Sequence, residues 1–250
     1  MARATARRDR FAGRARAASA AHRMHRNACM PVARARQRPP DMPGADRYLP
    51  EHLTLATMRA GVPACHGCPL YREATQAVFG EGAATARVML IGEQPGDSED
   101  LAGRPFVGPA GKLLDEGLAA AGIPRDAAYV TNVVKHFKFT RRGKRRIHDK
   151  PTRHEVEACK PWLGGELQVV APDIVVLLGA TAAQALLGAA FRVTKERGVE
   201  RATPLAPHTF ATVHPASVLR APDDLREQAR AELFADLQVI GDCYRRLPPA

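Results

Sequence analysis

Apolar residues in the last two hundred positions form short runs that alternate with segments of helical periodicity. Continuous apolar runs are typical of buried parallel strands, and apolar residues spaced three and four apart predict amphipathic helices. The predicted strands are residues 87–92, 129–134, 173–178 and 209–213, and the predicted helices are residues 109–122, 152–170, 180–187 and 222–241.

This order of elements predicts the fold class. Strands joined by helical crossovers indicate an α/β protein, a three-layer α/β/α sandwich around a central, mainly parallel, four-stranded sheet. Thr152 and Glu155 have the spacing of a capping box at the start of one helix. Ligands of such sheets bind beyond the carboxyl ends of the strands. Chemically distinctive residues follow three of the four predicted strands, so we expect the functional site there.

Charge separates the beginning of the chain from the rest. Residues 1–50 carry twelve Arg, no Lys and three Asp, a net charge of +9, whereas residues 51–250 carry 25 basic and 23 acidic side chains, a net charge of +2. The high isoelectric point, near 10.0, therefore comes mostly from the first fifty residues.

We expect residues 1–48 to be a disordered Ala/Arg-rich tail and residues 49–245 to form one domain, because the tail has too few large apolar groups to offset the entropy of ordering. The tail is either a basic arm that grips phosphates without sequence preference or an over-extended gene start, with Met30 or Met42 as the true first residue. No apolar segment has the length of a transmembrane helix, and no apolar h-region of a signal peptide follows the first arginines.

A glycine-rich segment follows the first predicted strand. Residues 92–97 read GEQPGD, and residues 103–111 read GRPFVGPAG. The P-loop and the G-x-G-x-x-G spacing are both absent, so we expect no nucleotide cofactor. Glycine lets the backbone approach a flat ligand closely, and Gln94 offers a donor and an acceptor to the edge of a base. Phe106 is either a stacking platform or a side chain that fills a gap in the core.

Two histidines lie in segments that suit anion binding. His214 begins the turn HPASVLR after the fourth predicted strand, where a neutral imidazole N–H could donate to a developing oxyanion. A lone histidine at a strand end is nevertheless more often structural. His148 ends the run RRGKRRIH at residues 141–148. By composition alone this run is a solvated basic loop or a phosphate grip, with His148 as one more donor.

The cysteines point to a metal rather than to disulfides. Cys65 and Cys68 form a C-x-x-C pair, and Cys159 lies far downstream in a chain of five cysteines. An odd number at such spacings suits a reduced compartment and a metal or cluster site. The fourth ligand is open among Cys29, Cys243 and a histidine, and spacing alone does not separate zinc from an iron–sulfur cluster. Unrelated buried cysteines are the alternative.

Taken together, these motifs resemble the uracil-DNA glycosylase superfamily, and most closely its family 4 iron–sulfur enzymes. The residues that carry the resemblance are GEQPG, GRPFVGPAG, the TN that follows the second strand, the cysteine pair and HPASVLR, over about residues 60–241. The combination of GEQPG with KRRIH, and VKHFKF where family 4 usually has a cysteine after VK, is similar to the UdgX subgroup. Ala216 departs from the serine that HPS-type motifs often hold at this position.

The resemblance implies a glycosylase that excises uracil from DNA, with single-stranded DNA preferred or accepted, and then links itself to deoxyribose C1′ through a histidine. It implies His148 as the nucleophile, Glu93 and Gln94 beside the reacting sugar and base, and His214 as the group that stabilises the uracil anion. The implied substrate-binding residues are Gly92, Gln94, Asp97, Phe106, Asn132, Arg146, Ser217 and Arg220. The implied ligands of a structural 4Fe–4S cluster are Cys65, Cys68, His136 and Cys159.

Two other hypotheses remain at this point. The first is an ordinary family 4 glycosylase that uses water and turns over, with His148 only a phosphate contact. The second is a non-catalytic basic DNA-binding module, although Gln94, Phe106, Asn132 and His214 are not the residues of a purely electrostatic grip. We expect uracil-containing DNA as the partner, no membrane association and a monomer. We also expect a bacterial cytoplasmic location, at the nucleoid when the protein is on DNA.

Overall fold

The computed structural model describes residues 42–249, which fall within one compact unit. Residues 1–41 of the predicted tail lie outside the described residues. The chain is already folded before the predicted boundary at residue 49. Ala45 is fully buried, and the backbone N–H of Gly44 donates to the carbonyl of Gly67 at 2.9 Å. A short 3-10 helix, η2 (Ala45–Tyr48), follows and packs on the long helix α5 (Arg153–Val170).

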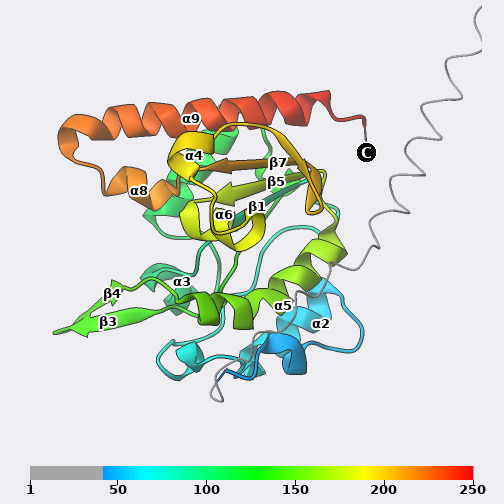
Figure 1. Ribbon diagram of the computed structural model, residues 1–250, viewed down its shortest axis with the longest axis vertical. Coiled ribbons are helices and arrows are strands. Elements are labelled where there is room, and N and C mark those ends of the chain that lie inside the picture. Colours follow the sequence, from blue (N-terminus) through cyan, green and yellow to red (C-terminus); the bar gives the residue numbers. More distant parts are fainter. Residues whose placement is uncertain (1–41, 250) are drawn as a thin grey trace, which may run out of the picture. The chain divides into compact units, whose positions relative to one another are not determined.

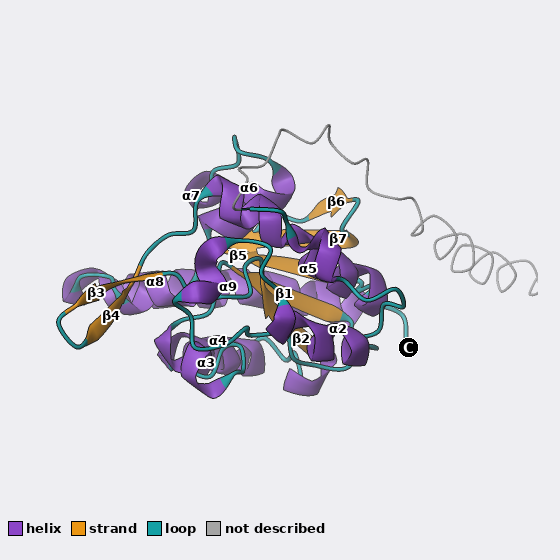
Figure 2. Cartoon of the chain, turned by 90° about the horizontal axis from the view of Figure 1, so that it is seen from below, coloured by secondary structure: helices purple, strands orange, loops and turns teal. Residues whose placement is uncertain are grey.

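The centre of the structure is a five-stranded sheet of order β2-β1-β5-β7-β6, seen between the helices in Figure 2. Four strands are parallel, and β6 pairs antiparallel with β7 at one edge. Every residue of β1, β2 and β5 is buried, as expected of parallel strands covered on both faces. The strands of this sheet are β1 (Val88–Gly92), β2 (Ala128–Asn132), β5 (Ile174–Leu178), β6 (Arg201–Thr203) and β7 (Ala206–Thr212).

Helices cover both faces of the sheet (Figure 1), which confirms the predicted three-layer α/β/α architecture. Alternate residues of β1 point to opposite faces: Met89 and Ile91 belong to the core under α5, and Val88 and Leu90 to the core under α4 and α9. The other helices are α2 (Leu55–Gly61), η3 (Val62–Ala64), η4 (Pro69–Arg72), α3 (Asp97–Ala102), α4 (Pro109–Ala120), η5 (Arg125–Ala127), α6 (Ala180–Leu187), α7 (Val193–Glu196), α8 (Pro215–Leu219) and α9 (Asp223–Arg246).

The helix that carries Cys159 begins as predicted. Thr152 Oγ1 accepts a hydrogen bond from the N–H of Glu155 at 3.3 Å, and Glu155 Oε2 accepts one from the N–H of Thr152 at 2.6 Å. No helix among the described residues is both long enough and apolar enough to cross a membrane.

The structure corrects two predictions. The sheet has five strands rather than four, because the three-residue edge strand β6 is too short to give an apolar pattern. The basic run is not a loop but an antiparallel hairpin of β3 (Phe139–Arg142) and β4 (Arg145–His148). Gly143 has a φ of +59° at the first position of its two-residue turn, where a hairpin favours glycine.

Candidate active site

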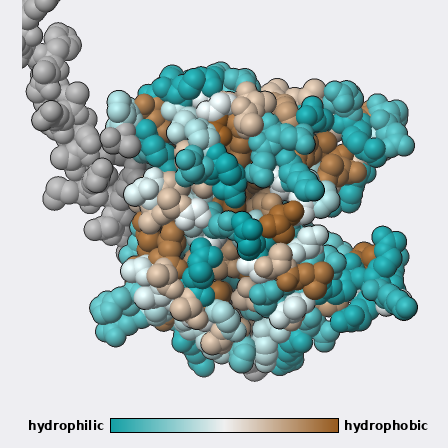
Figure 3. Space-filling model, turned by 180° about the vertical axis from the view of Figure 1, so that it is seen from behind, coloured by the Kyte–Doolittle hydropathy of each residue, from teal (hydrophilic) through white to brown (hydrophobic). Residues whose placement is uncertain are grey.

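A cavity of about 530 Å³ lies at the carboxyl ends of the parallel strands. In Figure 3 the surface is hollowed between the region of α8 and the β3–β4 hairpin. The cavity brings together most of the residues singled out in the sequence: Glu93, Gln94, Phe106, Asn132, His148, His214, Ser217 and Arg220 line it. Segments far apart in the chain therefore converge on one site, as expected at this edge of a parallel sheet.

The inner wall of the cavity (Phe106 and Asn132) lies at the ends of two neighbouring strands, β1 and β2. The register of β1 and β2 pairs Gly92 with Asn132. Asn132 is 3% exposed, and its Oδ1 atom is buried without a hydrogen-bond partner among the described residues. A Cβ atom at position 92 would collide with this oxygen. A buried amide oxygen without a partner is costly, so it suits a ligand that brings a donor.

Phe106 adds an aromatic face to the inner wall. Its backbone has a φ of +56°, which is unusual for a residue other than glycine. Glu99 bridges the two sides of this loop, because its carboxylate accepts hydrogen bonds from the N–H groups of Gly96 at 3.1 Å and Gly108 at 2.8 Å. The Phe106 ring lies 6.1 Å from the His214 ring at an interplanar angle of 23°. Two nearly parallel rings thus face the cavity.

His214 is held in one tautomer by its own turn. Its Nδ1 atom accepts a hydrogen bond from the backbone N–H of Ala216 at 3.1 Å, which places the proton of the neutral ring on Nε2. Burial lowers the pKa of His214 to about 4, although the charge of Glu93 opposes this shift. The neutral ring can therefore donate from Nε2 to negative charge that develops in the cavity.

Glu93 and His148 meet at the mouth of the cavity. His148 Nε2 lies 3.3 Å from Glu93 Oε1, and the hydroxyl of Thr181 donates to the other oxygen, Oε2. Burial raises the pKa of Glu93, but hydrogen bonds from His148 and Thr181 outweigh it, so the net pKa is below its usual value. Glu93 is therefore an anion that orients the imidazole. The His148 side chain is 47% exposed, which leaves it accessible to a large substrate.

The β3–β4 hairpin with His148 forms the outer wall of the cavity. Gln94 holds the end of this hairpin that joins the rest of the protein. The amide nitrogen of Gln94 donates to the carbonyls of Lys138 at 3.1 Å and Asp149 at 3.0 Å, and its oxygen accepts from the N–H of Lys138 at 3.1 Å. These backbone partners flank the hairpin directly. The sequence suggested that Gln94 reads a base edge, whereas in the structure its amide positions the strand that carries His148.

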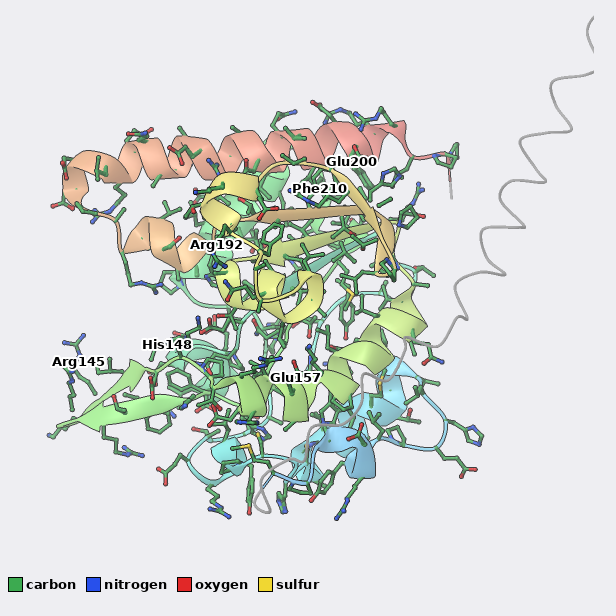
Figure 4. The ribbon with its side chains drawn as sticks, viewed as in Figure 1. Arg145, His148, Glu157, Arg192, Glu200 and Phe210 are labelled. Carbon is green, nitrogen blue, oxygen red and sulfur yellow. The ribbon has the colours of Figure 1, made fainter. Side chains whose placement is uncertain are left out.

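Arg146 fastens the face of the same hairpin. Its guanidinium binds Asp97 at 2.5 Å and the fully buried Asp100 at 2.6 Å, and it lies 5.1 Å from the Phe139 ring. Arg146 and His148 are two residues apart on β4, so both side chains point to the body of the protein. Arg145 lies toward the outer end of the hairpin, and His148 lies where β4 rejoins the body (Figure 4).

Three of the expected substrate-binding residues do not line the cavity. Gly92 lies next to Asn132 and Phe106 but is not itself a lining residue, and Asp97 and Arg146 bind each other. Ser217 does line it, with its hydroxyl donating to the carbonyl of His214 at 2.7 Å, and exposed Arg220 lies at its rim.

Sequence reasoning missed Thr181 and Glu99. Thr181 lies in the first turn of α6, directly after β5, and this position after the third predicted strand was the available signal. Glu99 lies in the short helix α3 and gave no signal of its own, because its partners are backbone N–H groups.

The three cysteines expected to bind metal are buried in the core on the α5 side of the sheet, and their thiols are free. His136 is buried as well. The backbone N–H of Lys135 donates to Cys159 Sγ at 3.2 Å. Burial raises the pKa of Cys68 to about 11 and lowers that of His136 to about 4. Buried thiols favour the neutral form until a cation balances their charge, and a neutral imidazole is the metal-binding form. This donor set fits a thiolate-bound metal group.

A second group of possible ligands lies elsewhere in the described residues. Glu200, His208 and Cys243 place one ligand atom each within 4.8 Å of one another. Glu200 already binds His208 Nδ1 at 2.7 Å and Arg246 at 3.2 Å. The group contains none of the four predicted ligands. The charge of the Glu200 carboxylate is already balanced by Arg246.

Comparisons with known proteins agree with this site. Residues 79–238 match the model of the uracil DNA glycosylase superfamily. The chain belongs to the uracil-DNA glycosylase superfamily. A type-4 uracil-DNA glycosylase of Pyrobaculum aerophilum is 40% identical over 195 residues, which cover 74% of this chain and 93% of that protein. The corresponding enzyme of Archaeoglobus fulgidus is 36% identical over 196 residues, which cover 75% and 92%.

A third type-4 uracil-DNA glycosylase, from Thermotoga maritima, is 39% identical over 160 residues, which cover 64% of this chain and 80% of that protein. The resemblance drawn from the motifs is thereby confirmed for the superfamily.

Proposed function

We propose that this glycosylase-superfamily chain excises uracil from DNA and then captures the deoxyribose through His148. The observation that carries the first step is the unpartnered Oδ1 atom of Asn132 beside the Phe106 ring. Uracil carries an N3–H donor next to a carbonyl acceptor, and a carboxamide complements this edge with its oxygen and its NH₂ group. Phe106 would stack on the flat ring. The target nucleotide must leave the duplex or arrive in single-stranded DNA to enter such a cavity.

Base release needs a donor at the departing uracil. The bond between C1′ and uracil N1 breaks with its electron pair on uracil, and the sugar gains oxocarbenium character. His214 donates from Nε2 to the uracil oxygen that takes up this charge. A neutral His214 suits this role, and the pKa of about 4 keeps the ring neutral near pH 7.

Capture uses the outer wall. A ring nitrogen of His148 forms a bond to C1′ as uracil leaves, and the positive charge of the alkylated ring is relieved when its N–H proton passes to the carboxylate of Glu93. The 3.3 Å contact between His148 Nε2 and Glu93 Oε1 supports this pairing. An N-alkylated imidazole is a poor leaving group, so the link persists and turnover stops. The basis for proposing the UdgX subgroup is the combination of GEQPG with KRRIH, and VKHFKF with His136.

The experiment that tests capture is a denaturing gel after incubation with uracil-containing single-stranded DNA. We expect a shifted band that survives heat and SDS and is lost in His148→Ser. His154→Ser is the matched control, because His154 is exposed on α5 and does not line the cavity. Free abasic product from the wild-type chain without a shifted band would leave the ordinary turnover reaction, in which water attacks C1′, as the function.

We also propose that Cys65, Cys68, His136 and Cys159 hold a 4Fe–4S cluster with a structural role. When bound, the cluster would join the segment around His136 to α5 and to the C-x-x-C segment. Protein purified without oxygen is expected to be brown and to contain iron and sulfide, and Cys159→Ser is expected to lose both. Colourless protein loaded with zinc would contradict the cluster and leave the glycosylase proposal intact.

A further inference from the structure

A fully buried ion pair lies behind the inner wall of the cavity. Lys135 follows β2, Glu166 lies on α5, and both side chains have 0% exposure. Lys135 Nζ is 2.6 Å from Glu166 Oε2. Neither residue lines the cavity, so neither touches a substrate there. Burying two charges is costly, and apolar residues often fill such a position with equal or better stability. The pair therefore suggests a role besides stability.

The ammonium group of Lys135 holds the end of β2. Besides Glu166, Nζ donates to Thr131 Oγ1 at 2.7 Å and to the backbone carbonyl of Asn132 at 2.8 Å. These three acceptors use all three of its N–H groups. Lys135 thus tethers the backbone of the residue whose side-chain amide forms the inner wall.

Glu166 fixes the other side of the pair. Its Oε1 atom accepts hydrogen bonds from the Tyr129 hydroxyl at 3.0 Å, the Thr131 hydroxyl at 2.9 Å and the backbone N–H of Gly80 at 3.1 Å. The carboxylate therefore joins β2 to α5 and to the chain before β1. Helix α5 also carries Cys159, whose sulfur accepts a hydrogen bond from the backbone N–H of Lys135. Lys135 therefore contacts both the end of β2 and one of the three buried thiols expected to bind metal.

We propose that the Lys135–Glu166 pair is a positioning device that sets the depth of the Asn132 amide in the cavity and, through it, the preference for uracil. This inference rests on the proposed function. A hydrogen bond weakens steeply with distance and angle, and a displacement of about 1 Å can cost about 100-fold in rate. The tether at the Asn132 carbonyl is the contact through which the pair acts.

Two variants separate positioning from stability. Glu166→Gln removes one charge but keeps the Lys135 contact to the Asn132 carbonyl, and it leaves the ammonium without a counter-ion. Lys135→Met/Glu166→Gln removes both charges and the tether together. We expect the double variant to resist denaturant better than the single variant, because no unpaired charge stays buried. It is nevertheless expected to bind free uracil roughly 10-fold to 100-fold more weakly than the wild type, by analogy with the loss seen when groups that support metal ligands are removed.

Free uracil is the probe for affinity, measured by its inhibition of excision, and single-turnover rates at several protein concentrations separate binding from the chemical step. Arg87→Met/Asp173→Asn is the control, because it removes a partly exposed pair at the opposite ends of β1 and β5. It is expected to leave uracil inhibition unchanged. Iron content is measured in each variant. We expect the double variant to retain its iron, because the backbone N–H of residue 135 still donates to Cys159.

The inference would be overturned if the double variant were inhibited by uracil as strongly as the wild type and kept the same preference for uracil over cytosine. So would an affinity loss that follows iron loss, since the effect would then come from the thiol group. If the wild-type chain releases no uracil at all, the proposed function fails and the inference fails with it.

Discussion

The two walls of the cavity are built in opposite ways. The inner wall stands on two fully buried strands, with Asn132 3% exposed and the Lys135–Glu166 pair behind it. The outer wall is a two-stranded hairpin whose histidine is 47% exposed and whose contacts to the body run mainly through Gln94 and Arg146. A two-stranded hairpin has little stability of its own. Under the proposed function, base recognition would therefore belong to the core, whereas capture would belong to an attached hairpin.

The largest loss of activity is expected from a substitution in the inner wall. Asn132→Leu keeps a similar volume and removes the amide, so we expect excision to fall by about 100-fold to 1,000-fold, the loss usual when one hydrogen-bonding group of a catalytic site is removed. Crosslinking should fall with it, because capture follows base release. Single-turnover release of uracil measures the effect. Unchanged release in this variant would show that the amide does not recognise the base.

At the outer wall, excision and capture should separate. Arg146→Met removes the contacts to Asp97 and Asp100, so His148 loses its fixed position. We expect the crosslinking rate to fall by about 10-fold to 100-fold, with uracil release changed only a few-fold.

Arg145→Met is the matched control on the same strand, because Arg145 is exposed and points away from the body. Equal effects of the two substitutions would argue that charge, and not the fixed position of β4, supports capture.

The pH dependence sharpens the contrast, because His214 stands close to the inner wall. Burial lowers its pKa from 6.5 to about 4, so the unfolded chain binds this proton more readily. The stability that neutral His214 contributes is therefore fully present above pH 6.5 and is lost as the pH falls toward 4. Uracil release should stay level down to about pH 5 and fall near pH 4. A step near pH 6.5 that His214→Asn removes would contradict this assignment.

The smallest effect is expected at the hairpin tip. Arg142, Lys144 and Arg145 are exposed there, close to one another at the turn. Replacing all three with Ser should weaken DNA binding. It should also lower the slope of log affinity against log salt by about 0.7 for each phosphate of a single strand that the variant no longer neutralises. Binding measured at several salt concentrations gives this slope. An unchanged slope would place the phosphate-binding cations elsewhere.

Much of the fold was predictable because its signals are local. The strands that end at Gly92 and Leu178 were predicted to within one residue, since their apolar runs are continuous and bounded by glycine. The β3–β4 hairpin was missed because nearly every residue in it is polar, so no alternation marks the strands.

The candidate site divides in the same way. Strand ends indicated the region of Asn132 and His214, but composition made His148 only a phosphate donor, and its role came from the resemblance. The role of Gln94 could not be predicted, because its partners are backbone atoms 44 and 55 residues away. Such contacts arise only after folding and leave no spacing in the sequence.

The missing side chain of Gly92 leaves room for the Asn132 amide and the Phe106 ring that line the cavity. A methyl group on this residue would collide with Asn132 Oδ1 and lie 2.8 Å from Phe106 Cζ, while the hairpin and its cations stayed untouched. We therefore expect a Gly92→Ala variant to bind DNA but to admit no pyrimidine into the cavity. In living cells, this variant would distinguish the consequences of occupying DNA from those of acting on it.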